Sequence, residues 1–191
     1  MTGKELHETV AQMGFAQTLE DGERYFNRAV NLSLSRICRL FPLFASFPLD
    51  AREGEGIRLA EVDGAFLGFP ASPIFGEALG GRGATLLTEG RDYLIRGDHV
   101  RFLKNAGRVT VYYLRRPREA NADNAEEALD IEPVAESLLP LLVASYLWLD
   151  DRGELATHYL KLYQAESEEL RRLHYRHGTV KITSTNGWDR S

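Results

Sequence analysis

The longest apolar segment of the chain covers residues 138–149 and ends at the acidic pair Asp150 and Asp151. A helix that is hydrophobic on nearly every face must be buried on all sides. At about 1.5 Å per residue the segment is much shorter than a bilayer core, so it does not predict a membrane span. It predicts a helix that is covered by the chain's own core or by neighbouring copies.

Helical spacing recurs towards the start of the chain. Leu6 and Val10 belong to a predicted helix over 3–13, which Gly14 breaks. A second helix is predicted over 19–40, with Thr18 as its N-cap and Pro42 as its stop. Its expected inner side holds Phe26, Val30, Ile37 and Leu40, and its expected outer side holds Arg24, Arg28 and Arg36.

The last third of the chain is predicted to be helical again. Pro133 suits the first turn of a helix, whereas Pro140 should kink the helix or restart it. Asp150 and Asp151 lie where capping between two helices is expected. A final helix is predicted over 154–174, and its expected inner side holds Leu155, Tyr159, Leu162, Tyr163, Glu166 and Leu170.

The middle of the chain alternates apolar and polar residues, as half-buried strands do. A strand is predicted over 57–62, and a three-stranded antiparallel meander is predicted over 92–115. Val109, Val111 and Tyr113 should share one face of its last strand. The stretch 66–90 is rich in glycine and proline, so a long loop with short extended pieces is expected there.

These elements predict an α+β fold: a helical bundle with an inserted antiparallel β module and an extended C-terminal tail. The expected bundle covers 1–50 and 118–174, the β-rich module covers 51–117, and a docking tail covers 175–191.

Charge is unevenly distributed in this chain of net charge −5. Residues 116–136 hold seven carboxylates against two arginines, and residues 171–191 hold five Lys or Arg residues against one Asp. This separation favours head-to-tail contacts between copies or with a partner. The single cysteine, Cys38, excludes an intramolecular disulfide, and the start of the chain lacks a signal-peptide pattern, so synthesis in the cytoplasm is expected.

No catalytic constellation is evident. The Gly-rich stretch 76–83 lacks the Gly-Lys-Ser/Thr of a phosphate loop, and His174 with His177 has no third metal ligand nearby. His7, His99 and His158 belong to separate elements without a serine or cysteine in a nucleophile context. We therefore expect a protein that is not an enzyme, with no catalytic residue, no metal and no cofactor.

The end of the chain suits docking. Residues 178–188 alternate polar and β-branched residues and close with Asn186, Gly187 and Trp188. Such a strand-forming segment with an aromatic anchor can add to a sheet edge or enter a pocket of another chain. The alternative is that this tail folds onto its own domain.

The order of these pieces resembles the head–tail connector (adaptor) proteins of tailed bacteriophages. The resemblance covers most of the chain. It is carried by the opening helices that end at Phe41 and Pro42, by the strands over 93–113, by the apolar helix over 138–146 and by the tail with Trp188.

The resemblance implies a structural virion protein of the neck region, made in the host bacterial cytoplasm. Its copies would form a ring, about twelve-fold, beneath the portal protein and extend the DNA channel towards the tail. DNA would pass without specific binding, no membrane would be involved, and a tail or stopper (nozzle) protein would be a further partner. The expected portal-docking residues are Arg171, Arg172, Tyr175, Arg176, Val180, Lys181, Ile182 and Trp188. The expected subunit contacts are Leu138, Leu142, Tyr146, Trp148, Tyr159 and Tyr163.

Two other functions stay open on the sequence. One is another neck component, such as a stopper or tail-completion protein, with the β-rich middle as its main domain. The other is a small intracellular enzyme whose site uses Arg, Tyr and Asp without a recognisable motif.

Overall fold

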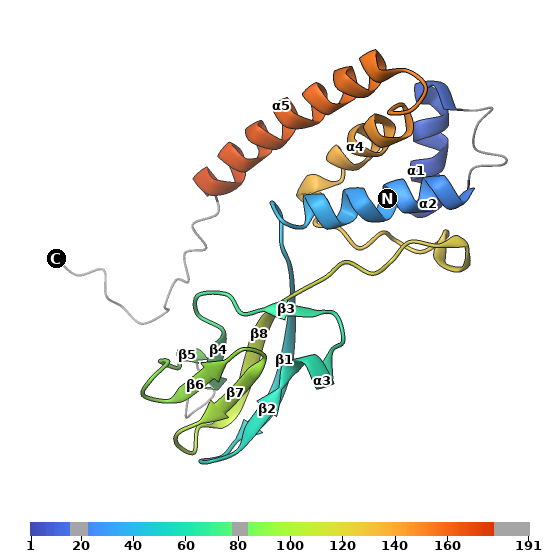
Figure 1. Cartoon of the computed structure of the whole chain (residues 1–191). Helices are drawn as coiled ribbons and strands as arrows, with labels where there is room; N and C mark the ends of the chain where they lie inside the picture. Colours follow the sequence, from blue (N-terminus) through green and yellow to red (C-terminus); the bar gives the residue numbers. More distant parts are fainter. Residues whose placement is uncertain (16–22, 78–83, 178–191) are drawn as a thin grey trace. The chain divides into compact units, whose positions relative to one another are not determined.

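The computed structural model describes residues 1–15, 23–77 and 84–177. The chain divides into two compact units, each with its own hydrophobic core. The helical unit is formed by Met1–Pro42 together with Pro117–Val180, and the β unit is formed by Leu43–Arg116. Figure 1 shows long helices in the first and strands in the second, which confirms the α+β fold class.

The helical unit is built mainly from four α-helices. They are α1 (Gly3–Val10), α2 (Glu23–Ile37), α4 (Leu138–Leu147) and α5 (Gly153–His177), with the short turns η1 (Ala11–Phe15), η2 (Ala122–Asn124) and η3 (Pro133–Ala135). Within this unit α4 lies between α2 and α5 and also contacts α1 (Figure 1).

The first helix begins with a capping box. The side chain of Thr2 accepts a hydrogen bond from the Glu5 N–H, and the Glu5 carboxylate accepts one from the Thr2 N–H. The predicted break occurs at Gly14, whose φ of 108° is available to glycine at little cost. In α2, Phe26, Val30 and Ile37 are buried as predicted, and Arg24, Arg28 and Arg36 are exposed. The predicted cap Thr18 lies outside the described residues.

The restart expected at Pro140 is confirmed. Pro140 is the third residue of α4, where its missing N–H would have had no partner inside the helix. The last helix, α5, extends three residues further than predicted. Tyr163 is buried on its inner side, but Leu162 is 41 % exposed, so the prediction that Leu162 faces inwards is wrong.

The β unit contains two antiparallel sheets. One has the order β1 (Leu43–Ala51), β8 (Gly107–Arg115), β4 (Ile74–Glu77) and β5 (Ala84–Leu86), with β3 (Phe66–Gly68) also on β8. The other has the order β2 (Gly56–Arg58), β7 (His99–Phe102) and β6 (Tyr93–Arg96). Side chains from both sheets and from the short helix α3 (Leu59–Val62) form a shared core, which includes Tyr93, Val100, Phe102 and the predicted face of Val109, Val111 and Tyr113.

Two predictions about this unit are wrong. Residues 43–50 belong to β1 and not to the bundle, because β1 pairs with β8 along nine residues in register. The meander is also interrupted: β6 and β7 form a hairpin, but β8 pairs with β1, β3 and β4. The loop between β7 and β8 instead bonds to the end of β1, since the Ala106 N–H donates to the Ala51 carbonyl at 3.1 Å, and to the residues after it, since Asn105 Oδ1 accepts from the Glu53 N–H at 2.9 Å.

The predicted strand over 57–62 is correct only for its first residues. The chain forms β2 up to Arg58 and then one turn of helix, α3. The Leu59 N–H donates to the Asp98 carbonyl at 2.9 Å, and the Leu59 side chain is fully buried. Leu59 thus enters the core of the β unit at the position where β2 ends and α3 begins.

Candidate subunit interface

The chain itself covers most of α4. Leu138 and Leu142 are fully buried, and Tyr163 of α5 is 2 % exposed. All three belong to the core of the helical unit with residues of α1 and α2. A neighbouring copy is therefore not needed to cover them, and the prediction that these three side chains form subunit contacts is corrected: they are core residues.

The other predicted contact residues are partly exposed. The Arg36 guanidinium donates a hydrogen bond to the Tyr146 hydroxyl at 3.4 Å and lies 5.7 Å from the ring centroid of Tyr163. The pKa of the Tyr163 phenol is raised, because the effect of burial exceeds the opposite effect of the nearby Arg36. Tyr159 packs against the edge of the core. Arg36 thus joins α2 to α4 and α5 on this side of the helical unit.

Trp148 is held by its own unit. The centroids of the Trp148 and Phe15 rings are 4.3 Å apart, and the Arg152 guanidinium lies 5.5 Å from the Trp148 centroid. A Cβ at Gly14 would come within 2.9 Å of the indole, so the glycine at this break also makes room for the tryptophan. The indole Nε1 is buried and has no hydrogen-bond partner in the described part of the chain.

A first apolar groove lies between α2 and the end of α4, and we name it the α2–α4 groove. Its volume is about 470 Å³. Tyr25, Leu32 and Leu149 line it and are 73 %, 49 % and 63 % exposed. Asp150 and Asp151 lie at the same groove. Neither carboxylate forms a hydrogen bond or ion pair with another described residue, so the predicted capping role is not observed.

A second apolar groove, the α4–α5 groove, has a volume of about 520 Å³. Leu141 of α4 and Leu162 and Leu173 of α5 line it, and the two α5 leucines are 41 % and 44 % exposed. Leu141 and Leu147, which line different grooves, are six residues apart in one helix. At about 100° per residue they point about 120° away from each other. The two grooves therefore open on different sides of α4.

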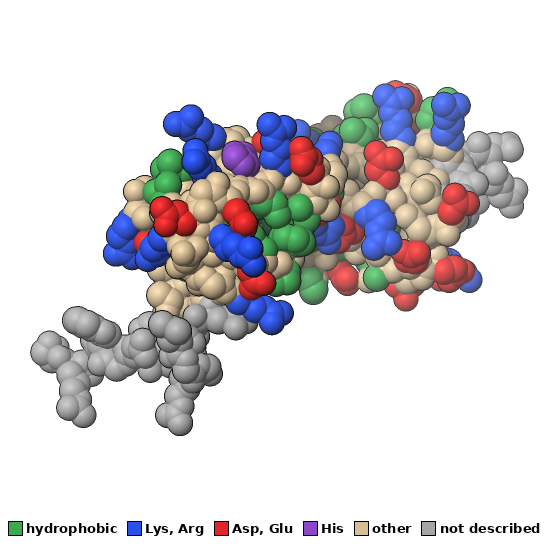
Figure 2. Space-filling view, turned by 90° about the horizontal axis from the view of Figure 1, so that it is seen from below, with side chains coloured by type: hydrophobic (Ala, Val, Ile, Leu, Met, Phe, Trp, Pro, Cys, Tyr) green, Lys and Arg blue, Asp and Glu red, His purple; other side chains and the backbone are tan. Residues whose placement is uncertain are grey.

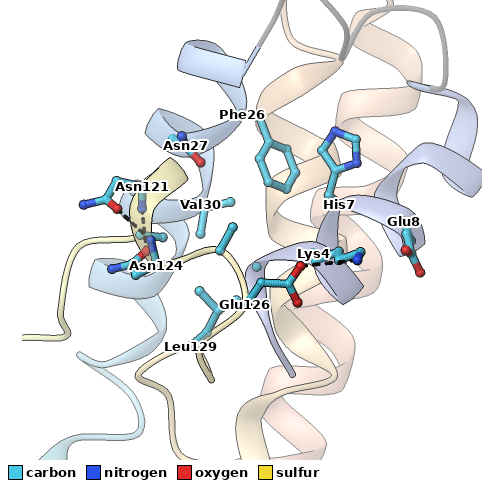
Figure 3. A pocket seen from close by; sticks show the side chains of 13 residues that line it. Lys4, His7, Glu8, Phe26, Asn27, Val30, Asn121, Asn124, Glu126 and Leu129 are labelled. Atoms are coloured by element: carbon cyan, nitrogen blue, oxygen red, sulfur yellow. Dashed lines mark hydrogen bonds and ion pairs between the residues drawn. The ribbon is translucent and has the colours of Figure 1, made fainter.

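A third hollow lies beside α1, and we name it the α1 pocket (Figure 3). Its volume is about 340 Å³. Phe26, Val30 and Leu129 line it with apolar surface, and the His7 ring meets Phe26 edge to face at 5.1 Å. At the rim the Lys4 ammonium lies 3.2 Å from a Glu126 carboxylate oxygen (Figure 3). The pocket can take a small apolar group, and the described residues that line it include no serine or cysteine.

The α2–α4 groove was missed by the sequence prediction. Tyr25 and Leu32 are seven residues apart and so lie on one face of α2, next to the arginines that were expected outside. The signal that the sequence offered for this groove was the apolar pair Tyr25 and Leu32 on the face predicted to be polar. Exposed apolar side chains also lie among charged ones on the face drawn in Figure 2.

Half of the predicted portal-docking residues belong to α5. The side chains of Arg171 and Arg172 are exposed, and Arg172 pairs with Glu168 one turn earlier. Tyr175 and Arg176 belong to the last turn of α5 and not to a tail. Val180, Lys181, Ile182 and Trp188 lie outside the described residues.

Other chemistry is sparse in the described residues. They contain no cluster of three or more His, Cys, Asp or Glu that could hold a metal ion. Cys38 is buried. None of the described helices is both long and apolar enough to cross a membrane. No protein-family model matches the chain, and no curated protein sequence matches it.

Proposed function

We propose that this protein is a structural virion component: a head-to-tail adaptor whose helical units pack side by side in a ring beneath the portal. The observation that carries the proposal is the pair of exposed apolar grooves on different sides of α4. Exposed leucines and a tyrosine grouped in this way are typical of protein–protein contact sites.

Two different grooves suit a ring better than a two-fold dimer. A contact that joins one surface of a subunit to a different surface of the next is heterologous, and repeated heterologous contacts give a ring when the rotation from copy to copy closes. In the proposed contact the exposed leucines of α5, Leu162 and Leu173, pack against the α2–α4 groove of the next copy. The exposed Lys161 beside Leu162 would then meet Asp150 and Asp151, which have no ion pair within the described residues.

The proposed attachment to the portal uses the end of the chain. Arg171, Arg172, Arg176 and Lys181 would guide it electrostatically, and Trp188 would be its anchor. An aromatic anchor in an interface typically contributes about 2 kcal/mol or more. Repetition around a ring multiplies small losses per subunit, so loss of Trp188 should prevent stable attachment.

The test uses the full chain and the portal protein encoded by the same genome. Mixing the two should give ring-shaped density below the portal in electron-microscopy class averages. The double variant Leu32→Glu, Leu149→Glu should stay folded but lose the ring, because charges would enter the apolar groove. Val134→Glu, which changes another exposed apolar residue of the helical unit, is the matched control and should keep it.

A second arm tests the end of the chain. Deletion of residues 178–191 leaves the described part of α5 complete, and Trp188→Ala changes the anchor alone. Both variants should keep the thermal midpoint and lose portal binding. The adaptor function would be refuted if the unaltered chain fails to bind portal across salt concentrations, or if it binds only below an adaptor ring that is already present, as a stopper would.

A further inference from the structure

The outer face of the β2–β7–β6 sheet gathers positive charge. His99 of β7 pairs across the sheet with Arg58 of β2 on one side and with Arg96 of β6 on the other. Arg101 lies two residues after His99 on the same strand and therefore on the same face. We call these four residues the basic sheet face.

The strand alternation fixes the direction of these side chains. Val100 and Phe102 of β7 and Tyr93 of β6 are at most 2 % exposed and belong to the core of the β unit. The residues between them must point to the opposite side of the sheet. Arg96 and Arg101 are exposed accordingly. The basic sheet face is thus held by a packed sheet and not by loops.

Most of this charge is not neutralised. Arg58 lies 3.6 Å from Glu61, and both side chains are largely exposed. Within the described part of the chain, the side chains of Arg96, His99 and Arg101 form no ion pair or hydrogen bond. Cations on adjacent strands of one sheet face destabilise each other, and an anion placed between them would remove that repulsion.

The three residues also surround a hollow. Arg96, His99 and Arg101, with Leu94, line a space of about 170 Å³. Beside it, the His99 ring occupies the place where residue 56 would carry a side chain. A Cβ at Gly56 would lie 2.3 Å from His99 Nε2. The glycine therefore allows the imidazole to lie close to β2.

The surplus of cations is local to this unit. Residues 43–116 hold ten Lys and Arg against nine Asp and Glu, whereas residues 1–42 and 117–180 together hold eleven against eighteen. In an acidic protein, two arginines of one sheet face that have no ion pair with any other described residue, Arg96 and Arg101, favour the binding of an anion.

We propose that the basic sheet face binds a phosphate group in the hollow between Arg96 and Arg101. Two guanidinium groups offer forked donors that match phosphate oxygens, and the imidazole of His99 adds a third direction of approach. A carboxylate offers two oxygens and one charge and would leave donors unused, so phosphate chemistry fits better. The phosphate can be free inorganic phosphate or part of a DNA backbone, and the site does not depend on the adaptor function.

The experiment titrates the ¹⁵N-labelled full chain with inorganic phosphate and, separately, with a fluorescein-labelled 20-nucleotide single-stranded DNA. Both should shift the Arg96 and Arg101 Nε–H signals and the backbone signals of β6 and β7. The double variant Arg96→Gln, Arg101→Gln should bind at least tenfold more weakly. If DNA is the source, its binding should fall with salt, and the double variant should have a smaller salt slope, by about 1 to 2.

The matched control is Arg24→Gln, Arg39→Gln, which removes two exposed arginines from the helical unit. It should bind both probes as the unaltered chain does, and all variants should keep their thermal midpoints. Shifts with phosphate but not with DNA would identify free phosphate as the source, and displacement of DNA by phosphate would identify one shared site. Absence of shifts at β6 and β7 with both probes, equal loss in the control, or equally tight binding of polyglutamate would overturn the proposal.

Discussion

At the scale of single residues, one charged side chain of the β unit is buried: Asp92 is 1 % exposed. Asp92 accepts hydrogen bonds from the Thr88 N–H and from the Arg91 guanidinium, and its oxygen lies 2.9 Å from the Lys104 ammonium. The hydrogen bonds from Arg91, Lys104 and Thr88 hold the pKa of Asp92 well below its usual range. These partners offset the cost of burying the charge of Asp92. The hydrogen bond from the Thr88 N–H also holds the turn before β6.

Asp92→Asn should lower the thermal midpoint of the β unit by several degrees at neutral pH. The folded-state pKa lies below the unfolded value of about 3.9, so the stabilisation is complete above that value. It is lost as the pH falls from about 4 towards the lower folded-state pKa. Thermal unfolding of both proteins between pH 7 and pH 2 should therefore show a difference that shrinks in acid.

Asp50→Asn provides the control, because Asp50 is an exposed carboxylate of β1 in the same unit. It should change the midpoint little at any pH. A difference between Asp92→Asn and the unaltered chain that stays constant down to pH 2 would contradict the assigned role of the ionised carboxylate.

Gly14→Ala should destabilise the helical unit by about 1–3 kcal/mol, the usual cost of placing a side chain at a strained backbone position. The φ of 108° disfavours alanine, and its Cβ would meet the Trp148 ring at 2.9 Å. Urea unfolding monitored by circular dichroism measures the change. Gly64→Ala, with no atom within 4 Å of the added Cβ, should be close to neutral, and similar losses for both would argue against this explanation.

At the scale of elements, α4 has two roles on two sides. Leu142 on its inner side is fully buried, whereas Leu149 just beyond its end is 63 % exposed. An apolar sequence alone does not distinguish these positions. The packing of α2 and α5 against α4 decides which leucines belong to the core and which remain for a partner.

Leu142→Ala should lower the free energy of unfolding by about 2–5 kcal/mol, because it leaves a cavity in a packed core. Leu149→Ala should change it by no more than about 0.5 kcal/mol. Chemical denaturation measures both. A large loss of stability in Leu149→Ala would mean that this end of α4 is part of the core and not of an interface.

At the scale of the whole molecule, the first and last residues of the β unit lie next to each other in space. Leu43 at the start of β1 pairs with Arg115 at the end of β8. Each unit has its own core. When a module is inserted in this way, a short linker can replace it and still join the two flanking segments of the helical unit.

A chain in which residues 43–116 are replaced by a short Gly-Ser linker should therefore fold, and the fragment 43–116 should fold as well. Each should show a dispersed NMR spectrum and cooperative thermal unfolding. The spectrum of the fragment should overlay the corresponding signals of the full chain. A fragment that is unfolded beside a folded linker variant would show that the β unit depends on the helices.

The sequence by itself determined the elements whose signals are local. The periodicity of Phe26, Val30 and Ile37, the break at Gly14 and the restart at Pro140 are properties of short segments, and all three are present in the fold. The tertiary structure alone decided the partner of β8, the early end of β2 and the difference between Leu142 and Leu149. These features depend on contacts between residues distant in the sequence, and hydrophobic pattern specifies that a residue is buried but not which segment buries it. The basic sheet face belongs to the same group, because Arg58, Arg96 and His99 become neighbours only when β2, β7 and β6 pair.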